Sequence, residues 1–378
     1  MVHGQPQRKL NVSTIRDVAK LAGVGVGTAS RALSGKGAVS PLALEKVLAA
    51  AESLNFRPSA IAQALSLQRS GSLGVYVPEL ASFFYSSIVT AADQLLRAHG
   101  RHLVVVCGSP SRNPRQEALD GVAFLLSRDC DGLLLTGNDL TDADLRDIAT
   151  RVEHLAVINR QVKGMKGRCF IPDHEEGGRI AARALLSQGH RRVAALTGPS
   201  TVLDNRLRMK GFLAELAVHG MEPSLVFNGD FTRECGWDIG ARLARTVNRQ
   251  AAADQRCTAV FCANDRMAMG LISRLWVEGW RVPDDLSVVG YDNDDFACFA
   301  TPPLTTVHMP LIELARLATA QVMRQCYGES CELQPPGPPA LALRLSVGRG
   351  PFEAIGPSPL INEHADATAA ALYPPRAS

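Results

Sequence analysis

Two hydrophobic patterns divide the chain near residue 72. Before it, apolar residues recur at helical spacing in short stretches. After it, continuous apolar runs alternate with helical stretches, and eight such runs follow one another: SLGVYV, HLVVVCG, GLLLTG, LAVINR, RVAALTG, LVFNGD, TAVFCAN and LSVVGYD. Runs of this kind followed by helices are typical of parallel strands buried on both faces. Eight are too many for one small sheet, so we expect an α/β core of two doubly wound parallel-sheet subdomains, with a single (β/α)₈ barrel as the alternative.

The N-terminal stretch predicts three short helices. The first follows Thr14 as a cap and stops at Gly23 in TIRDVAKLAG. The second follows Gly25 in the cap position, and the third opens with Ser40 as a cap before a proline. Three helices within some forty residues, the first two joined by a short turn, indicate an all-α helix-turn-helix head.

The glycines of LAGVGVGTASRAL raise a choice between two kinds of phosphate site. A dinucleotide-binding loop needs G-x-G-x-x-G between a strand and a helix. Here the spacing is G-x-G-x-G and the preceding segment is helical, which favours a turn that contacts DNA. The helix start at Gly25 can receive a phosphate on its backbone N–H groups, and Thr28, Ser30 and Arg31 can reach phosphates and base edges. We also count the caps Thr14 and Ser40 among the DNA-binding residues.

Charge and composition restrict the partners. Residues 1–71 hold nine Lys or Arg and three acidic residues, a net charge of +6, whereas the whole chain is +3. A basic head on a near-neutral body indicates a polyanionic partner. The nine cysteines are scattered singly, and neither a signal peptide nor a membrane-spanning run is seen. We therefore expect a cytoplasmic, nucleoid-associated protein with no membrane partner.

The remaining segments complete the predicted organisation. Residues 1–57 form the head, 58–71 a hinge helix and linker, 72–349 the core, and 350–378, rich in Pro and Ala, a disordered tail. In the hinge, a short helix can begin at Pro58 with Ala62 and Leu65 on one face. Near the end of the core, LALRLSVGRG is expected to be the last strand.

Residues that follow strands are the candidates for a ligand site in the core. Asn264, Asp265 and Asp292 stand at two strand ends, and Arg206 and Arg208 open a helix. Such carboxylates, amides and arginines suit sugar hydroxyls. The aromatic residues Phe84, Tyr85 and Phe231 could stack on the apolar face of a sugar. Two alternatives stay open: Asp265 could cap the next helix, and Phe231 could belong to the core.

The sequence resembles the LacI/GalR family of bacterial transcription regulators. The motifs that carry the resemblance are TIRDVAKLAGVGVGTASRALSGKGAVS and LNFRPSAIAQALS, and the similarity covers residues 13–348. It implies a core with the periplasmic-binding-protein fold and a homodimer that binds a palindromic operator in double-stranded DNA. It also implies that Val26 and Gly27 set operator choice, and that Leu65 wedges into the minor groove. Gly27 departs from the family because it has no side chain that could read a base.

The resemblance also implies a small-molecule effector. Positions matching Arg208, Asn264 and Asp292 contact effector in the family. The stretch LAVINRQVKGMKGRCF resembles the galactose-repressor branch, whereas DHEEGGRIAARALLSQGHRRVAALTGP resembles lactose- and β-glucoside-repressor sequences. These similarities make Asn159 and Asp173 further candidates. A sugar or glycoside is expected, with galactosides favoured over a purine-type ligand. The function implied is a repressor that sugar releases from its operator.

Other functions remain as rivals. A co-repressor-type regulator would bind DNA more tightly with its ligand, and the sequence does not decide this sign. A sugar-transport protein should carry an export signal and lack the basic head. A sugar-processing enzyme needs a catalytic pair, yet no G-x-S-x-G, H-E-x-x-H or Walker motif occurs. We expect no catalytic residues, no metal and no cofactor.

Overall fold

The computed structural model describes residues 13–34, 38–56, 69–109 and 113–357. The chain divides into two compact units, residues 1–71 and residues 72–378. The predicted hinge residues Ala62 and Leu65 lie outside the described residues, as does the end of the chain from residue 358.

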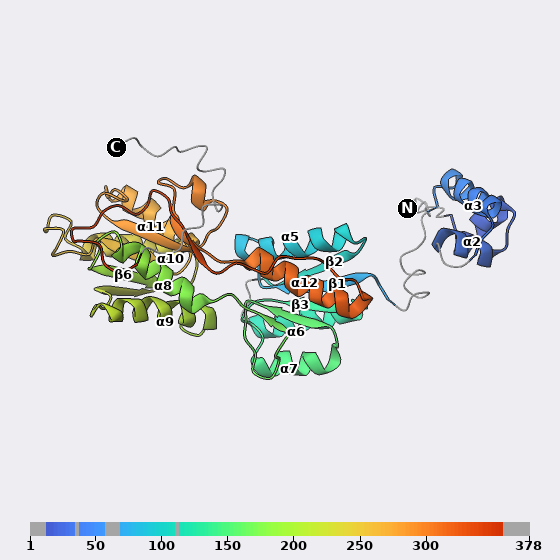
Figure 1. Cartoon of the computed structure of the whole chain (residues 1–378), viewed down its shortest axis with the longest axis horizontal. Coiled ribbons are helices and arrows are strands. Elements are labelled where there is room, and N and C mark those ends of the chain that lie inside the picture. Colours follow the sequence, from blue (N-terminus) through green and yellow to red (C-terminus); the bar gives the residue numbers. More distant parts are fainter. Residues whose placement is uncertain (1–12, 35–37, 57–68, 110–112, 358–378) are drawn as a thin grey trace, which may run out of the picture. The chain divides into compact units, whose positions relative to one another are not determined.

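The head consists of three helices, α1 (Ile15–Ala22), α2 (Val26–Ser34) and α3 (Pro41–Ser53), at the predicted places (Figure 1). Gly23 ends α1 in the left-handed conformation with φ of 67°. Small side chains let the three helices approach closely, and the buried set is Val18, Ala19, Ala22, Ala29, Ala32, Val47, Ala50 and Ala51. The helix-turn-helix prediction is therefore confirmed.

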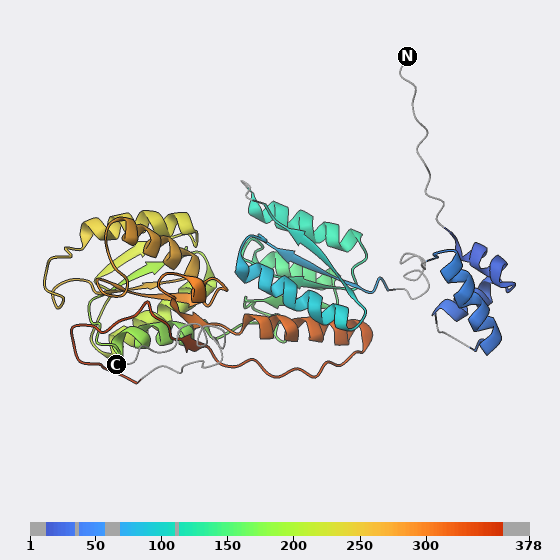
Figure 2. The same ribbon diagram turned by 90° about the horizontal axis from the view of Figure 1, so that it is seen from above.

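The first sheet of the core has the strand order β2-β1-β3-β4-β5. Its strands are β1 (Ser72–Val77), β2 (His102–Cys107), β3 (Gly132–Leu135), β4 (Leu155–Ile158) and β5 (Cys169–Phe170), all paired in parallel. The helices of this subdomain are α5 (Phe83–Ala98), α6 (Pro114–Ser127), α7 (Asp142–Arg151) and α12 (Leu311–Tyr327). Figure 2 shows α12 in orange-red beside α5 in cyan, and both helices pack on one face of the sheet.

The second sheet has the order β11-β10-β9-β8-β6-β7. Its strands are β6 (Val193–Thr197), β7 (Leu225–Asn228), β8 (Ala259–Cys262), β9 (Ser287–Asp292), β10 (Thr305–His308) and β11 (Ala340–Ala342). Only β11 is antiparallel to its neighbour. The helices of this subdomain are α8 (His174–Leu186), α9 (Leu203–Val218), α10 (Arg233–Thr246) and α11 (Asp265–Val277), with a 3₁₀ turn η1 (Ala297–Phe299) after β9.

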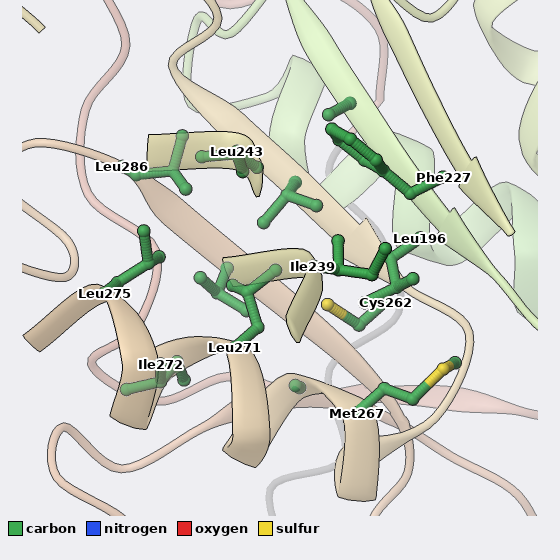
Figure 3. Packing of buried hydrophobic residues seen from close by; sticks show 14 of the residues in the cluster. Leu196, Phe227, Ile239, Leu243, Cys262, Met267, Leu271, Ile272, Leu275 and Leu286 are labelled. Carbon is green, nitrogen blue, oxygen red and sulfur yellow. The ribbon is translucent and has the colours of Figure 1, made fainter. Parts of the chain in front are cut away.

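Each central strand of the second sheet is buried on both faces. Along β6, Ala194 and Leu196 face α10 and α11, whereas Val193 and Ala195 face α8 and α9. Figure 3 shows the first of these two clusters, with Leu271 and Met267 of α11 packed near Leu196. Burial on both faces explains why the strands appear as continuous apolar runs. Two doubly wound sheets are thus confirmed, and the single barrel is excluded.

The chain passes between the two subdomains three times. It leaves the first sheet after β5, returns after β10 to form α12, and leaves again to form β11. The helix α12 completes the first subdomain, because its residues Ala315, Ala318 and Val322 are buried with Leu73 and Val75 of β1. These three crossings match the expected periplasmic-binding-protein arrangement.

Two expectations for the end of the core differ from the structure. The last strand is shorter than LALRLSVGRG, because β11 ends at Ala342. Residues 350–357, which we assigned to the tail, continue on the core: the backbone N–H groups of Gly350, Phe352 and Ile355 donate to carbonyls of residues 186–189. Ile355 also packs on the second sheet's core, and Arg191 lies 5.0 Å from the Phe352 ring centroid. Scattered contacts of this kind have no sequence period, so composition alone suggested disorder.

Candidate functional sites

The cap residues of the head have local structural roles. The backbone N–H and the hydroxyl of Thr14 both donate to the Asp17 carboxylate, at 2.8 and 2.7 Å. The Ser40 hydroxyl oxygen accepts from the backbone N–H of Ala43 at 3.3 Å. These bonds fix the starts of α1 and α3. Contact of Thr14 and Ser40 with DNA stays a prediction.

The start of α2 is an open surface. The Gly25 carbonyl accepts from the N–H groups of Thr28 and Ala29, at 2.9 and 3.0 Å, so Gly25 is the residue before the helix as predicted. Val26, Gly27, Ser30 and Arg31 are exposed, and Val26 exposes 45% of its surface.

Arg31 also contacts its own helix, since its Nη2 donates to the Thr28 hydroxyl at 3.4 Å. The first N–H groups of a helix have no partner within it, so this surface can receive a phosphate.

Six of the eight predicted effector residues line one pocket of the core, of about 230 Å³. We call it the cleft pocket. Side chains from both subdomains form it: Pro78, Phe84, Tyr85, Asn138, Asp139, Val202, Asp204, Arg208, Phe231, Asn264 and Asp292. The carboxyl ends of parallel strands and the first turns of helices meet here, which is where open α/β sheets bind ligands.

Arg208 is the central charge of the cleft pocket. It is 2% exposed, and its guanidinium lies 4.1 Å from the Tyr291 ring centroid and 5.6 Å from that of Phe231. Its Nη1 donates to the carbonyl of Ala263. Burial alone would lower the pKa of Arg208, but the facing carboxylates Asp292 and Asp204 raise it overall. The cation is therefore held in one orientation.

Asp292 faces Arg208 without forming a hydrogen bond to it. Its Oδ1 lies 3.7 Å from Arg208 Nη1. Among the described residues, Asp292 Oδ1 and Arg208 Nε are buried and have no hydrogen-bond partner. Burial raises the pKa of Asp292 well above its usual value, although Arg208 opposes the shift. Buried polar atoms without a partner cost about 1–3 kcal/mol each, so a ligand that pairs them gains that much.

Backbone strain gathers at the same place. Phe231 has φ of 70° and Asp292 has φ of 102°, values that L-residues other than glycine rarely adopt. Asn264 supports Phe231, because its side-chain amide donates to the Phe231 carbonyl at 3.0 Å. Residues held in such conformations cluster at binding sites, where the surrounding structure fixes them.

Asn159 lies behind the pocket instead of lining it. Its amide donates to Asp204 Oδ2 at 3.0 Å, so its Oδ1 must accept from His174 Nε2 at 2.8 Å. The other nitrogen of His174 then accepts from the Tyr291 hydroxyl at 3.1 Å. Burial and then Arg208 lower the pKa of His174 well below its usual value, so the ring is neutral. The network orients Asp204, a pocket residue that the sequence reasoning missed.

Two further predicted residues also have structural roles. Asp173 is exposed and caps α8, accepting from the N–H of Glu176 at 2.9 Å. Asp265 does not cap α11, because Asn264 occupies that position and accepts from the N–H of Met267. Asp265 is instead fully buried, and it accepts from the Thr306 hydroxyl at 2.6 Å and the N–H of Asp294 at 2.8 Å. It thereby holds the loop after Asp292.

Simple signals would have found the missed pocket residues. Asn138 and Asp139 follow the strand β3, so the same rule that selected Asn264 selects them. Asp204 stands four residues before Arg208 on α9 and therefore on the same helix face. Burial raises the pKa of Asp139, and the Tyr76 hydroxyl, which donates to it at 3.4 Å, opposes this shift.

Comparison with known proteins identifies the family. Residues 14–59 match the lacI family of bacterial regulatory proteins, and residues 182–347 match the periplasmic binding protein-like domain. The chain is 33% identical to the HTH-type transcriptional regulator GalS of Salmonella typhimurium, over 83% of this chain and 90% of GalS. This chain belongs to the lacI family.

Other members of the lacI family are similar to this chain in sequence and in structure. The HTH-type transcriptional repressor PurR of Vibrio parahaemolyticus is 33% identical over 79% of this chain and 87% of PurR. The lac repressor dimer bound to operator and the anti-inducer ONPF superposes with a TM-score of 0.77, at 28% identity over 89% of this chain and all of that chain. The transcriptional regulator CelR in complex with cellobiose gives 0.58, at 29% identity over 88% of this chain and 99% of that chain.

Membership of the lacI family assigns the chain's general role. It is a DNA-binding transcription regulator with a small-molecule effector, and not an enzyme. Among the described residues, no group of three or more His, Cys, Asp or Glu side chains could hold a metal ion. Within the same part of the chain, no helix has both the length and the apolar character needed to cross a bilayer.

Proposed function

We propose that this lacI-family regulator is a homodimeric repressor whose operator complex is released by a neutral sugar or glycoside in the cleft pocket. The observation that carries the proposal is the pairing of Arg208 with Asp292, each with a buried polar atom that has no hydrogen-bond partner among the described residues. A hydroxyl group both donates and accepts, so two adjacent hydroxyls can pair with a guanidinium and a carboxylate together.

The charge balance of the cleft pocket favours a neutral ligand. Three carboxylates, Asp139, Asp204 and Asp292, line it together with one cation, Arg208. An anionic ligand has no proton to donate to these acidic groups, whereas a hydroxyl group donates to a carboxylate and accepts from a protonated carboxyl group. Phe84, Tyr85 and Phe231 supply flat apolar surface for the C–H face of a ring. Among sugars, galactosides remain the favoured class, on the similarity of residues 155–170 to the galactose-repressor branch.

A purine-type ligand is the second candidate, because three aromatic side chains could also stack on a base. A purine fits the acidic side chains of the cleft pocket less well than a sugar does. It has few hydrogen-bond donors for them, and its ring nitrogens need donors from the protein. The similarity to PurR keeps this class in the test.

The mechanism is a shift between two arrangements of the subdomains. A ligand that contacts both Phe84 of the first subdomain and Asp292 of the second favours the closed form. If operator DNA favours the other form, ligand and operator weaken each other by the same factor. We place the protein on the nucleoid, where its operator lies, as a homodimer like the lac repressor.

The test measures this coupling. A duplex enriched by the protein from random DNA is titrated by fluorescence anisotropy, with and without galactose, methyl β-D-galactoside, lactose, cellobiose, guanine and hypoxanthine. A releasing sugar should weaken operator binding about 5–150-fold. Unchanged operator affinity with a sugar that binds would contradict the mechanism, and tighter binding would establish the co-repressor alternative.

Asp292 provides the matched variant. Asp292→Ala should abolish the sugar response and leave DNA affinity within about twofold, because the head carries the DNA contacts. Asp292→Asn, which keeps the volume, separates the loss of charge from the loss of packing. Asp238→Asn, at an exposed position of α10, is the control and should respond as the wild type does. A normal response in Asp292→Ala would remove this residue from the site.

A further inference from the structure

A second hollow lies beside the cleft pocket. It has a volume of about 250 Å³, similar to the 230 Å³ of the cleft pocket. Residues of both subdomains line it, chiefly Phe83, Ser86, Arg233, Arg266, Asp294 and Phe296. We call it the side hollow. None of these residues was selected from the sequence as part of the effector site.

Four chain segments line both the side hollow and the cleft pocket, and the cleft pocket has further lining residues such as Asn138, Asp204 and Arg208. In each of these segments, a residue of the cleft pocket stands one or two positions from a residue of the side hollow. The pairs are Phe84 and Phe83 in α5, Phe231 and Arg233 at the start of α10, Asn264 and Arg266 at the start of α11, and Asp292 and Asp294 at the end of β9. Because neighbouring residues of a segment lie a few ångströms apart, the two hollows adjoin along one seam between the subdomains.

Asp294 is the buried acceptor of the side hollow. It is 5% exposed, and its carboxylate has no hydrogen-bond partner among the described residues. Its backbone N–H donates to Asp265, which fixes its position. Burial, with Asp265 and Asp295 nearby, raises the pKa of Asp294 to about 8, although Arg266 opposes the shift. A largely buried carboxyl group that lines a hollow and makes no side-chain hydrogen bond within the described residues is available to pair with a polar ligand.

Two arginines provide donors opposite this carboxyl group. Arg266 is fixed across the seam, because its Nη1 donates to Glu79 Oε1 of the first subdomain at 2.8 Å. Arg233, the first residue of α10, is exposed at the rim. With Asp294 and Asp295 as the acidic residues, the side hollow offers both hydrogen-bond donors and acceptors, the combination that hydroxyl groups need.

We propose that the side hollow is a second saccharide subsite, so that the effector is a glycoside of at least two rings that fills both hollows. The proposal rests on the proposed sugar effector and narrows its class. Phe83 and Phe296 lie there as aromatic surfaces for a second ring, as Phe84 and Phe231 do in the cleft pocket. The similar volumes of the two hollows suit units of similar size.

The test compares one-ring and two-ring sugars by isothermal titration calorimetry on the full chain. The one-ring probes are galactose and methyl β-D-galactoside, and the two-ring probes are lactose, melibiose and cellobiose. The wild type should bind one of the two-ring sugars about tenfold more tightly than the one-ring sugars. Arg233→Ala and Asp294→Asn should each remove most of this advantage and leave one-ring affinity within about twofold.

Arg245→Ala, an exposed substitution on the same helix as Arg233, is the matched control and should keep the advantage. Arg233 is exposed, so its variant tests the subsite even if Asp294→Asn folds poorly. Equal affinity for one and two rings, equal loss of both in the variants, or two one-ring molecules bound per chain would overturn the proposal.

The two proposals fail in distinguishable ways. If Asp292→Ala abolishes binding while Arg233→Ala changes nothing, the sugar effector stands and the second subsite falls. If no sugar binds the wild type, both fall together.

Discussion

In the head, a Cβ atom added to Gly25 or Gly27 would meet nothing within 4 Å. In the core, a Cβ on Gly178 would lie 1.9 Å from the carbonyl oxygen of Arg208, and one on Gly211 would lie 1.8 Å from that of Glu175. The helices α8 and α9 therefore cross in backbone contact. The helices α10 and α11 repeat this arrangement through Gly236 and Gly270.

Glycine therefore occupies these positions for different reasons in the head and in the core. In the core, packing requires glycine, because the crossing of α8 and α9 sets the position of Arg208 and with it the cleft pocket. In the head, packing does not require it, so Gly25 and Gly27 leave a bare strip of backbone at the start of α2. A strip of that kind lets a phosphate approach but gives no side chain for reading bases.

The largest effect is expected at the helix crossing. Gly178→Ala should lower the free energy of unfolding by at least about 2 kcal/mol, because the neighbouring carbonyl belongs to backbone and cannot turn aside. Urea unfolding followed by circular dichroism measures the loss. Gly337→Ala is the control, since a Cβ there meets nothing within 4 Å. An unchanged midpoint for Gly178→Ala would mean that α8 and α9 do not cross this closely.

The sequence predicted the central strands well, for a physical reason. Strands buried on both faces, such as β6 and β8, leave continuous apolar runs. All eight predicted runs are strands, including the partly exposed edge strands β2 and β7. The edge strands β5 and β11 have only two and three residues, which is too short for a hydrophobic period to be recognised in the sequence. Their pairing depends on which strand lies beside them in the fold.

The candidate site was predictable where it follows from topology. Phe231, Asn264 and Asp292 follow or end strands, and the carboxyl ends of parallel strands share one edge. The network through Asn159 and His174 was not predictable, because it depends on the side-chain positions of residues far apart in sequence. That Phe231, Asn264 and Asp292 contact the effector stays a prediction.

Acid should affect the core through its buried histidines, and the described part of the head contains none. His190 Nε2 donates to the Gly348 carbonyl at 3.1 Å, and its Nδ1 accepts from the Thr258 hydroxyl at 2.9 Å. Burial lowers the pKa of His190 from 6.5 to about 4. The unfolded chain therefore binds this proton first. Stability from His190 is complete above pH 6.5 and is lost as the pH falls toward 4.

The experiment compares how the free energy of unfolding of the wild type and of His190→Gln changes with pH. The comparison is needed because Asp265 and Asp294, with pKa values raised to about 7 and about 8, increase stability as the pH falls through the same range. Between pH 7.5 and 4.5 the wild type should lose about 2 kcal/mol more than His190→Gln. His102→Gln, at an exposed histidine, is the control. Parallel losses in wild type and His190→Gln would show that His190 is protonated in the folded chain.

The smallest effect is expected in the head, at Gly27→Ala. No neighbour obstructs the new methyl group, and alanine favours a helix over glycine by up to about 1 kcal/mol. The head should therefore become slightly more stable, which a thermal melt of the full chain followed at the α-helical signal can detect. Affinity for random duplex DNA, and its slope with salt, should not change, because no charge is altered. If that affinity falls more than about threefold, a phosphate rests directly on the backbone at Gly27. Glycine would then be required there by DNA, as Gly178 is required by the fold.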